Sequence, residues 1–196
     1  MTPVPHRVVA RVQETHDTWT LELEPRGDPI RPRAGQFAML YAFGIGEVPI
    51  SASADVEADE PLTHTIRAVG AVTSALCSLE PGDLVWARGP YGNGWPLPEA
   101  RGRDLVVVAG GIGLAPLRPV VRRALARRDE YGELSVLIGA RTPDDLLFLR
   151  EVEAWRARLD AEVDVTVDAA PLGWRGRVGL VTRLLPRAVF DAENVA

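Results

Sequence analysis

Hydrophobic and polar positions alternate along the first hundred residues. Over residues 19–24, Trp19, Leu21 and Leu23 fall on one face of an extended chain, and Thr and Glu residues fall on the other. Similar short segments lie at residues 7–12, 37–43, 64–69 and 84–88, separated by turn residues. Only residues 72–79 indicate a helical turn. Several short strands at this spacing predict an antiparallel β-barrel over residues 1–100.

After residue 101 the pattern changes to strands that alternate with helices. Residues 105–109 form a continuous apolar run, which is typical of a strand buried on both faces. A helical period follows over residues 117–128. The same order repeats, with strands expected at 133–140 and 163–167 and helices at 144–159 and 178–185. This alternation predicts an α/β doubly wound parallel sheet over residues 101–196.

The composition restricts the chemistry that this chain can perform by itself. The single cysteine, Cys77, excludes an internal disulfide framework, a CxxC redox pair and an iron–sulfur or zinc site built from the chain's own thiolates. The three histidines are scattered without metal-ligand spacing, so we expect no bound metal. Redox chemistry would therefore depend on an organic cofactor or a partner.

Charge and hydropathy exclude two further classes of protein. The net charge is −5, with −6 in residues 1–100 and +1 in residues 101–196, so a uniform nucleic-acid-binding surface is not expected. The longest nearly apolar run, residues 105–117, is shorter than the ~20 residues that cross a bilayer. The N-terminus lacks the apolar core of a secretory signal, which predicts a cytoplasmic protein without membrane insertion.

A glycine-rich turn, AGGIGLAP, joins the apolar strand at 105–109 to the following helix. Gly110, Gly111 and Gly113 would let backbone N–H groups approach a pyrophosphate closely at a helix N-terminus. The spacing departs from the common dinucleotide fingerprint, because Pro116 stands where a third glycine is expected. The alternative is a tight turn without a ligand, with Pro116 simply starting a helix.

The second strand of this half ends in GARTPDDLLF. Ligands of such sheets lie beyond the carboxyl ends of the strands, so Arg141 is placed to meet a phosphate or a ribose. Solvated surface is an equal alternative for Arg141, and capping of the next helix is the favoured role for Asp144 and Asp145.

Two segments of the first half differ from plain barrel strands. In EVPISAS, Pro49 fixes the backbone, and Ser51 and Ser53 present hydroxyls on one side of an extended chain. In AVGAVTSAL, Gly70 ends a strand and Thr73 and Ser74 stand where a short helix would begin and could accept an anion. Taken singly, a strand end and a helix cap are the favoured interpretations of these two segments.

Together the motifs EVPIS, RAVGAVTSAL, RGPYGNGWPLP, VVVAGGIGLAPL and GARTPDDLLF resemble the ferredoxin–NADP reductase superfamily. The chain is most similar to gamma-type reductase subunits of nickel–iron hydrogenases and to the electron-transfer subunit of dihydroorotate dehydrogenase. The resemblance covers nearly the whole chain. It implies an N-terminal FAD-binding barrel, residues 1–100, and a C-terminal NAD(P)-binding domain, residues 101–196, with the nicotinamide stacked on the flavin.

The resemblance also implies roles for individual residues. Three would line the flavin ring, with Ser51 near its N5 atom: Pro49, Ile50 and Ser51. Four would hold the pyrophosphate and adenosine side of FAD: Arg67, Gly70, Thr73 and Ser74. Five would bind the nicotinamide nucleotide: Gly110, Gly111, Gly113, Pro116 and Arg141.

Two features depart from the family pattern. Glu47 and Val48 stand where many members place an arginine, so Arg67 would have to compensate for a missing phosphate contact. Family members also continue beyond the equivalent of Val195 into a strand with a Cys-Gly-Pro motif, and the two relatives then carry cysteines for a [2Fe–2S] cluster. The sequence ends at DAENVA, which is expected of either a fragment or a shortened member.

These implications define the expected function. The chain would be a flavoprotein oxidoreductase module that passes electrons between NAD(P)H and, through FAD, an iron–sulfur centre of a partner such as a hydrogenase-type subunit. One alternative is a non-catalytic FAD-binding or docking subunit without NAD(P)H turnover, and another is a reductase that acts alone with free flavin. The segment GARTPDD offers both an arginine and acids, so the choice between NAD and NADP stays open, with NAD favoured.

Overall fold

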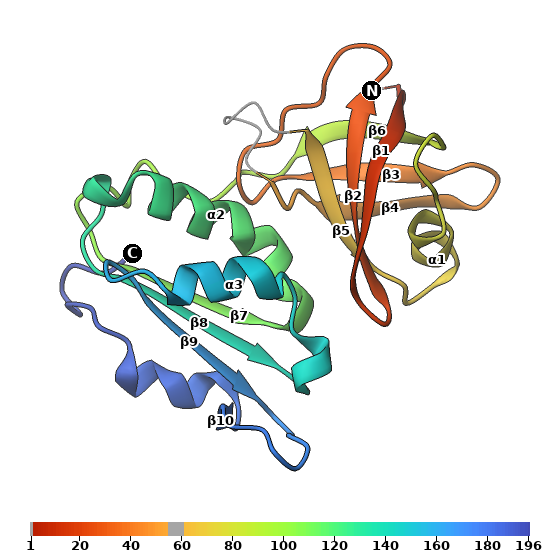
Figure 1. Cartoon of the computed structure of the whole chain (residues 1–196). Coiled ribbons are helices and arrows are strands. Elements are labelled where there is room, and N and C mark those ends of the chain that lie inside the picture. Colours follow the sequence, from red (N-terminus) through yellow and green to blue (C-terminus); the bar gives the residue numbers. More distant parts are fainter. Residues whose placement is uncertain (1, 55–60) are drawn as a thin grey trace. The chain divides into compact units, whose positions relative to one another are not determined.

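The computed structural model describes residues 2–54 and 61–196 and divides the chain into two compact units, Met1–Trp95 and Pro96–Ala196. We call them unit 1 and unit 2 and describe each by itself (Figure 1). Each unit has its own sheet and its own buried residues. In the described residues, no helix is long and apolar enough to span a bilayer.

Unit 1 is a six-stranded antiparallel sheet with the strand order β4-β3-β6-β1-β2-β5. The edge strands β4 and β5 contact each other and helix α1, so the sheet is barrel-like. The elements are β1 (Val4–Thr15), β2 (Thr18–Pro25), β3 (Phe37–Ala42), β4 (Gly46–Ser51), β5 (Leu62–Arg67), α1 (Ala71–Cys77) and β6 (Leu84–Tyr91). This architecture confirms the predicted antiparallel barrel.

The alternating pattern of the sequence explains the core of unit 1. Leu21 and Leu23 on β2 are fully buried, while Glu24 on the same strand is exposed. Strand β4 was not predicted, because it contains Pro49, a residue that argues against a strand in a sequence. Proline cannot donate to a ladder, but β4 is an edge strand, where the missing N–H is tolerated.

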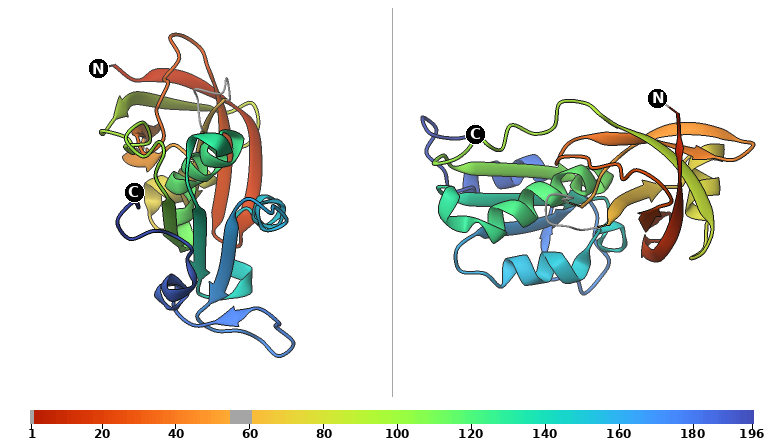
Figure 2. Two further views of the ribbon diagram at one scale, coloured as in Figure 1. Left: turned by 90° about the vertical axis from the view of Figure 1, so that its left-hand side faces the viewer. Right: turned by 90° about the horizontal axis from the view of Figure 1, so that it is seen from above.

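Unit 2 contains a parallel sheet in the order β10-β9-β8-β7. Its elements are β7 (Leu105–Gly110), η2 (Gly111–Gly113), α2 (Leu114–Ala126), η3 (Arg128–Glu130), β8 (Leu134–Ala140), η4 (Pro143–Asp145), α3 (Leu149–Arg156), β9 (Glu162–Val167), β10 (Arg177–Val178) and η5 (Val181–Arg187). Helices α2 and α3 cover one face and η5 covers the other (Figure 2). Every residue of β8 is buried, as expected of a strand covered on both faces. The predicted α/β parallel sheet is confirmed.

Two helix predictions in unit 2 were right only in part. The helix expected over 144–159 is a short 3₁₀ turn, η4, followed by α3. Leu146, Leu147 and Phe148 interrupt it because all three are buried, and three consecutive residues cannot lie on one face of a helix. The helix expected over 178–185 is replaced by β10 and η5, since Gly179 has φ +135° and turns the chain between them.

Asp104 joins three segments of unit 2. Its carboxylate accepts hydrogen bonds from the backbone N–H of Glu133 at 2.7 Å and of Asp191 at 2.6 Å. Its backbone forms an isolated parallel bridge with Val195. One edge of β7 pairs with β8. The bridge from Asp104 therefore lies at the edge of β7 that faces away from β8, and it fixes the segment around residue 195 there.

Candidate functional site

The first cluster of predicted residues lies on β4 and on the turn that begins α1. Ile50 packs against the core of unit 1, whereas Pro49 is exposed and Ser51 is half-buried. The backbone carbonyl of Ser51 accepts a hydrogen bond from Nδ1 of His64 at 3.0 Å. Burial lowers the pKa of His64 to about 4, so the ring is neutral at pH 7 and donates only through Nδ1. His64 therefore holds Ser51 in position.

Gly70 is the N-cap of α1, and Thr73 is used for capping. The Thr73 hydroxyl accepts hydrogen bonds from the backbone N–H groups of Val69 and Gly70, each at 3.0 Å. Thr73 is buried, while Ser74 and Gly70 are exposed. A Cβ atom at Gly70 would meet nothing within 4 Å, so open space lies over this turn. The cap predicted as an alternative is present, and the exposed side of the turn consists of Gly70 and Ser74.

Arg67 lies at the end of β5 and pairs with an acid that the sequence analysis did not single out. Its Nε donates to Asp17 Oδ2 at 2.6 Å. Burial by itself would raise the pKa of Asp17, but hydrogen bonds from Arg67, Thr18 and Thr15 lower it below the ordinary value. The guanidinium of Arg67 is therefore anchored by one edge.

Arg88 pairs with Glu47, which stands with Val48 at the point where many members of the resembled family have an arginine. It donates to the two carboxylate oxygens of Glu47, from Nε at 3.0 Å and from Nη2 at 2.5 Å. The hydrogen bond from Arg88 lowers the pKa of Glu47 below its ordinary value. Strand β3 lies between the two residues, so only the sheet order brings them together.

In unit 2 the glycine-rich turn follows β7 directly. Gly111 has φ +52°, a left-handed conformation that favours glycine. Added Cβ atoms at Gly110, Gly111 and Gly113 would all meet nothing within 4 Å, so the space over the turn is open. Pro116 lies in the first turn of α2, where its missing N–H costs no helical hydrogen bond. Backbone N–H groups at this helix start can approach an anion.

Arg141 directly follows β8, at the carboxyl end of the parallel sheet. Its side chain is 61% exposed and donates from Nη2 to Asp145 Oδ1 at 3.1 Å. Thr142 and Asp145 form a capping box, in which the Thr142 hydroxyl donates to Asp145 at 2.7 Å. Burial would raise the pKa of Asp145, but its bonds from Thr142 and Arg141 lower it. Asp145 thus caps a turn, as predicted, and also partly neutralises Arg141.

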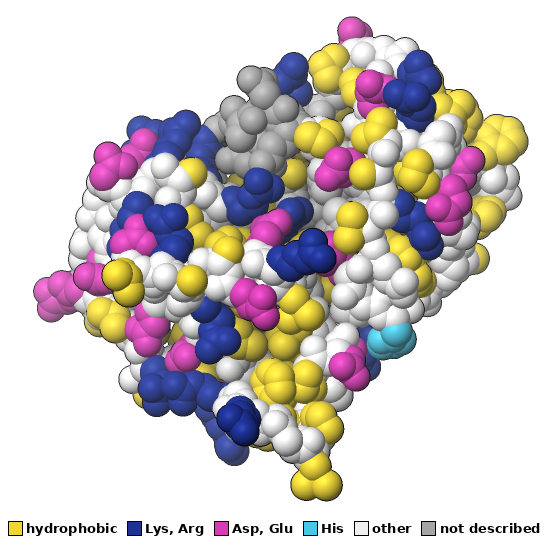
Figure 3. Space-filling view, viewed as in Figure 1, with side chains coloured by type: hydrophobic (Ala, Val, Ile, Leu, Met, Phe, Trp, Pro, Cys, Tyr) yellow, Lys and Arg dark blue, Asp and Glu magenta, His cyan; other side chains and the backbone are white. Residues whose placement is uncertain are grey.

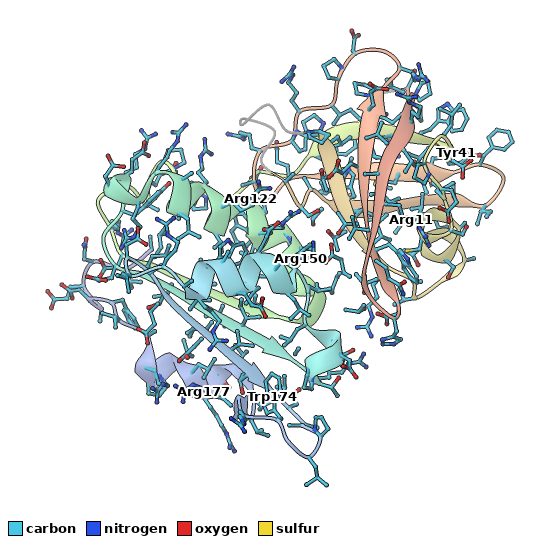
Figure 4. All side chains as sticks on the ribbon, viewed as in Figure 1. Arg11, Tyr41, Arg122, Arg150, Trp174 and Arg177 are labelled. Atoms are coloured by element: carbon cyan, nitrogen blue, oxygen red, sulfur yellow. The ribbon has the colours of Figure 1, made fainter. Side chains whose placement is uncertain are left out.

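A groove of about 880 Å³ lies between α3 and the segment after β9. Leu149 and Val152 contribute apolar walls, and Trp174 lines the groove beside Arg177, to whose carbonyl it donates at 3.2 Å (Figure 4). Asp144 also lines it, which places this groove next to the segment that carries Arg141. The groove can take a flat, partly apolar group.

In the view of Figure 3, arginine side chains intersperse with Asp and Glu side chains over much of unit 2, and dark-blue side chains gather toward the lower left. Within residues 2–54 and 61–196, no group of three or more His, Cys, Asp or Glu side chains is placed to hold a metal ion.

Comparison with known proteins identifies the architecture. Residues 107–194 match the family model of the oxidoreductase NAD-binding domain. A ferredoxin NADP⁺ reductase from Neisseria gonorrhoeae with bound FAD and NADP superposes with a TM-score of 0.80 at 18% identity, over 100% of this chain and 83% of that chain. This chain has a ferredoxin–NADP reductase-like fold. The resemblance predicted from the motifs is confirmed.

Sequence relatives of this chain are named as a sulfhydrogenase gamma subunit and as a dihydroorotate dehydrogenase electron transfer subunit. Sulfhydrogenase 1 subunit gamma of Pyrococcus furiosus is 38% identical over 167 residues, which are 84% of this chain and 57% of the relative. A probable dihydroorotate dehydrogenase B (NAD(+)) electron transfer subunit of Methanopyrus kandleri is 40% identical over 187 residues, 95% of this chain and 65% of the relative. The chain thus matches less than two thirds of the length of either relative.

Within each unit the reductase-like fold brings together most of the residues singled out from the sequence. In unit 1, α1 contacts β4 and β5, which carry the remaining predicted residues of that half. In unit 2, the glycine turn and Arg141 follow neighbouring parallel strands, and Gly110 pairs with Gly139. Sequence reasoning missed Asp17, His64, Arg88 and Trp174. Their positions depend on strand pairing and loop folding, which leave no local signal in the sequence.

Proposed function

We propose that this chain is a flavoprotein oxidoreductase module that moves electrons between NAD(P)H and an iron–sulfur centre of a partner subunit, with FAD as the carrier. The observation that carries the proposal is the open space over Gly110, Gly111 and Gly113 at the start of α2. A glycine cradle at a helix start at the carboxyl edge of a parallel sheet fits a nucleotide pyrophosphate. The NAD-binding family match over 107–194 supports it.

Unit 1 also has open space beside its candidate residues, and this space would fit a flavin. Space is open over Gly70, and Ser74 is exposed beside it, so this turn would hold the pyrophosphate of FAD together with Arg67. Pro49, Ile50 and Ser51 would line the ring, with Ser51 near N5 and its backbone fixed by His64. Thr73 would act by shaping the turn, because its hydroxyl caps α1.

The residues of unit 2 would bind the nicotinamide nucleotide. Gly110, Gly111, Gly113 and Pro116 would form the pyrophosphate turn, and Arg141 would contact the ribose or its phosphate. The groove lined by Trp174 would accept the adenine end. When bound, FAD supplies the conversion of one hydride into two single electrons. The protein contributes placement, because holding reactants in one geometry removes much of the entropic barrier.

The partner follows from the relatives' names. Proteins called hydrogenase gamma subunit and dihydroorotate dehydrogenase electron transfer subunit work as parts of larger assemblies, and we extend that arrangement to this chain. The alternative, a docking subunit that binds FAD without NAD(P)H turnover, predicts flavin binding without reduction by either coenzyme.

Reduction of the purified chain under anaerobic conditions tests the proposal. The chain reconstituted with FAD should be yellow, and NADH should bleach it within seconds in a stopped-flow experiment, with single electrons then passing to an artificial iron–sulfur acceptor. A colourless chain that takes up no FAD would overturn the proposal. A yellow chain that neither NADH nor NADPH bleaches would favour the docking subunit.

A further inference from the structure

The turn between β1 and β2 carries an acid that reaches the end of β5. Asp17 lies in this turn, and Thr18, the first residue of β2, faces Arg67, the last residue of β5, in the β2–β5 register. The backbone carbonyl of Asp17 accepts a hydrogen bond from the N–H of Ala68 at 2.8 Å. Strands β1, β2 and β5 lie side by side in Figure 1. The turn therefore holds the backbone at the point where the chain leaves β5.

The two carboxylate oxygens of Asp17 have different partners. Oδ1 accepts hydrogen bonds from the hydroxyls of Thr15 at 3.0 Å and Thr18 at 2.9 Å. Oδ2 accepts from Nε of Arg67 at 2.6 Å, and the exposed ring of His16 lies 3.7 Å from the same oxygen. Thr15 and Thr18 are both buried. They fix the carboxylate on one side, and Arg67 meets it on the other.

This arrangement occupies only one edge of the Arg67 guanidinium. In the part of the chain that the structure describes, the Arg67 side chain makes its hydrogen bond through Nε, and its two Nη groups have no partner there. The side chain is 31% exposed. The Nη groups of an arginine can donate paired hydrogen bonds to the oxygens of a phosphate. Arg67 therefore keeps an edge that an anion can use.

Arg88 on β6 shows the contrasting arrangement. Its Nε and Nη2 both donate to the carboxylate of Glu47, and its Nη1 donates to the hydroxyl of Tyr91 at 3.2 Å. A carboxylate that binds two nitrogen atoms in this way occupies the guanidinium edge. At Asp17 one oxygen already accepts from two hydroxyls, which leaves Oδ2 alone for Arg67.

We infer that Asp17 is a positioning residue, which holds the Arg67 guanidinium so that its Nη groups are presented to a pyrophosphate. The inference rests on the proposed function, in which Arg67 holds the pyrophosphate of FAD. A long arginine side chain loses rotamer freedom when it binds a ligand, and a side chain that is already fixed loses less. Asp17 thus raises the affinity of the chain for a pyrophosphate.

The negative charge of Asp17 acts in the opposite direction, because by itself it repels a pyrophosphate. Positioning and repulsion therefore predict opposite results when the side chain is removed. If positioning prevails, affinity falls without Asp17, and if repulsion prevails, affinity rises. The partners of the carboxylate favour positioning, since Arg67 and two hydroxyls all donate to it.

Flavin binding by the full chain measures this sign. Asp17→Ala should weaken FAD binding about fivefold, the cost of ordering one long side chain on binding. It should leave the binding of riboflavin, which has no phosphate, unchanged. Asp17→Asn keeps an oxygen for Nε and should restore FAD binding. Glu24→Ala is the matched control, because it removes another acid that pairs with an arginine, Arg7. FAD binding that is unchanged or tighter in Asp17→Ala would overturn the inference.

A double-mutant cycle shows whether Asp17 acts through Arg67. In the Arg67→Ala background, Asp17→Ala should have no further effect on FAD binding, because the group that it positions is gone. An equal loss in both backgrounds, or a loss that riboflavin shares, would contradict the inference, because the acid would then support only the fold of the turn. Thermal unfolding of each variant checks that it folds.

A measurement on Arg67 itself needs neither FAD nor an Asp17 variant. In the full chain with isotope-labelled arginine, nuclear magnetic resonance should show the Nε–H of Arg67 protected from exchange with solvent. Inorganic pyrophosphate should shift the Arg67 side-chain signals without removing that protection, and Arg67→Lys assigns them. An Nε–H that exchanges as fast as that of the exposed Arg31, or signals that pyrophosphate does not move, would overturn the inference.

These experiments separate the possible failures. A wild-type chain that binds no FAD would refute the proposed function, and the pyrophosphate titration would still decide whether Asp17 presents Arg67 to such an anion. A chain that binds FAD, but whose Asp17→Ala variant binds it equally tightly, would refute the role of Asp17 alone.

Discussion

Single side chains decide how firmly the proposed flavin segment is held. Ser51 is fixed through its backbone carbonyl by His64, whose ring is fully buried. A buried imidazole that donates one hydrogen bond is best kept neutral, because burial disfavours the charged form. The same residue therefore links the position of Ser51 to the pH at which the fold is stable.

The first prediction concerns this link. The unfolded chain binds a proton at His64 near the ordinary pKa of 6.5, but the native chain does so only near 4. Between these values the unfolded state holds more protons, so stability falls as pH falls, by roughly 3 kcal/mol for this residue. His64→Gln keeps a donor for Ser51 and does not titrate, so it should remove most of that loss.

Denaturant unfolding at several pH values between about 7 and 4.5 measures the effect. His16→Gln is the matched control, because it makes the same substitution at an exposed position outside β4 and β5. An unchanged slope in His64→Gln would show that the buried ring does not govern acid stability.

Arg141 supports a second prediction at the same scale. Its guanidinium is exposed and only partly neutralised by Asp145, so it is available to a ribose or phosphate. Arg141→Ala should raise the KM for NADH about fivefold, which corresponds to about 1 kcal/mol, with a larger rise for NADPH. Arg150→Ala, an exposed arginine on α3, serves as the control. Unchanged kinetics with both coenzymes would place Arg141 outside the site.

At the scale of elements, a glycine directly precedes a helix in each of the two units. Gly70 precedes α1 and Gly113 precedes α2, and neither residue has a positive φ. A Cβ atom at either position would meet nothing within 4 Å. A Cβ atom therefore fits sterically at both turns in the protein itself, and a loss of cofactor binding in either alanine variant would indicate a ligand that uses the open space.

These two turns give reciprocal variants. Gly113→Ala should leave the free energy of unfolding unchanged or raise it by about 0.4–1 kcal/mol, because alanine restricts the unfolded chain. It should weaken NADH binding about tenfold or more, about 1.4 kcal/mol, and leave FAD binding intact. Gly70→Ala should weaken FAD binding and leave NADH binding intact. Fluorescence titrations with each cofactor test both, and a variant that weakens neither ligand would remove its turn from the site.

At the scale of the whole molecule, the chain has two separate cores. Leu21 on β2 is fully buried in unit 1, and Leu137 on β8 is fully buried in unit 2. Truncating a buried leucine to alanine costs about 3 kcal/mol. Because each unit has its own core, we expect thermal unfolding in two steps, with each variant lowering mainly the step of its own unit.

Calorimetry with tryptophan fluorescence distinguishes the two steps. Leu21→Ala should lower one transition and Leu137→Ala the other, while Val12→Ala, an exposed position on β1, should shift neither. A single transition that both leucine variants lower equally would show that the units unfold as one.

The sequence by itself determined the order and type of most elements. Alternation of period two gave β2, and the continuous apolar runs gave β7 and β8, because burial on one or both faces of a sheet imposes these patterns directly. The pattern failed where tertiary contacts override it. Strand β4 contains a proline that only an edge position tolerates, and Leu146, Leu147 and Phe148 end a helical pattern because all three are buried.

The candidate site likewise contains residues that the sequence suggests and partners of those residues that only the structure identifies. The glycine turns and Arg141 are candidates from local sequence features, because a glycine-rich turn before a helix and a strand end can both be recognised locally, and Ser51 is a candidate through the family resemblance. The partners of these residues could not be found from the sequence. His64 lies 13 residues from Ser51, Asp17 lies 50 from Arg67, and Arg88 lies 41 from Glu47. These pairs form only through strand register, which the tertiary structure alone decides, because hydrogen-bond pairing between distant strands depends on the packing of the whole sheet.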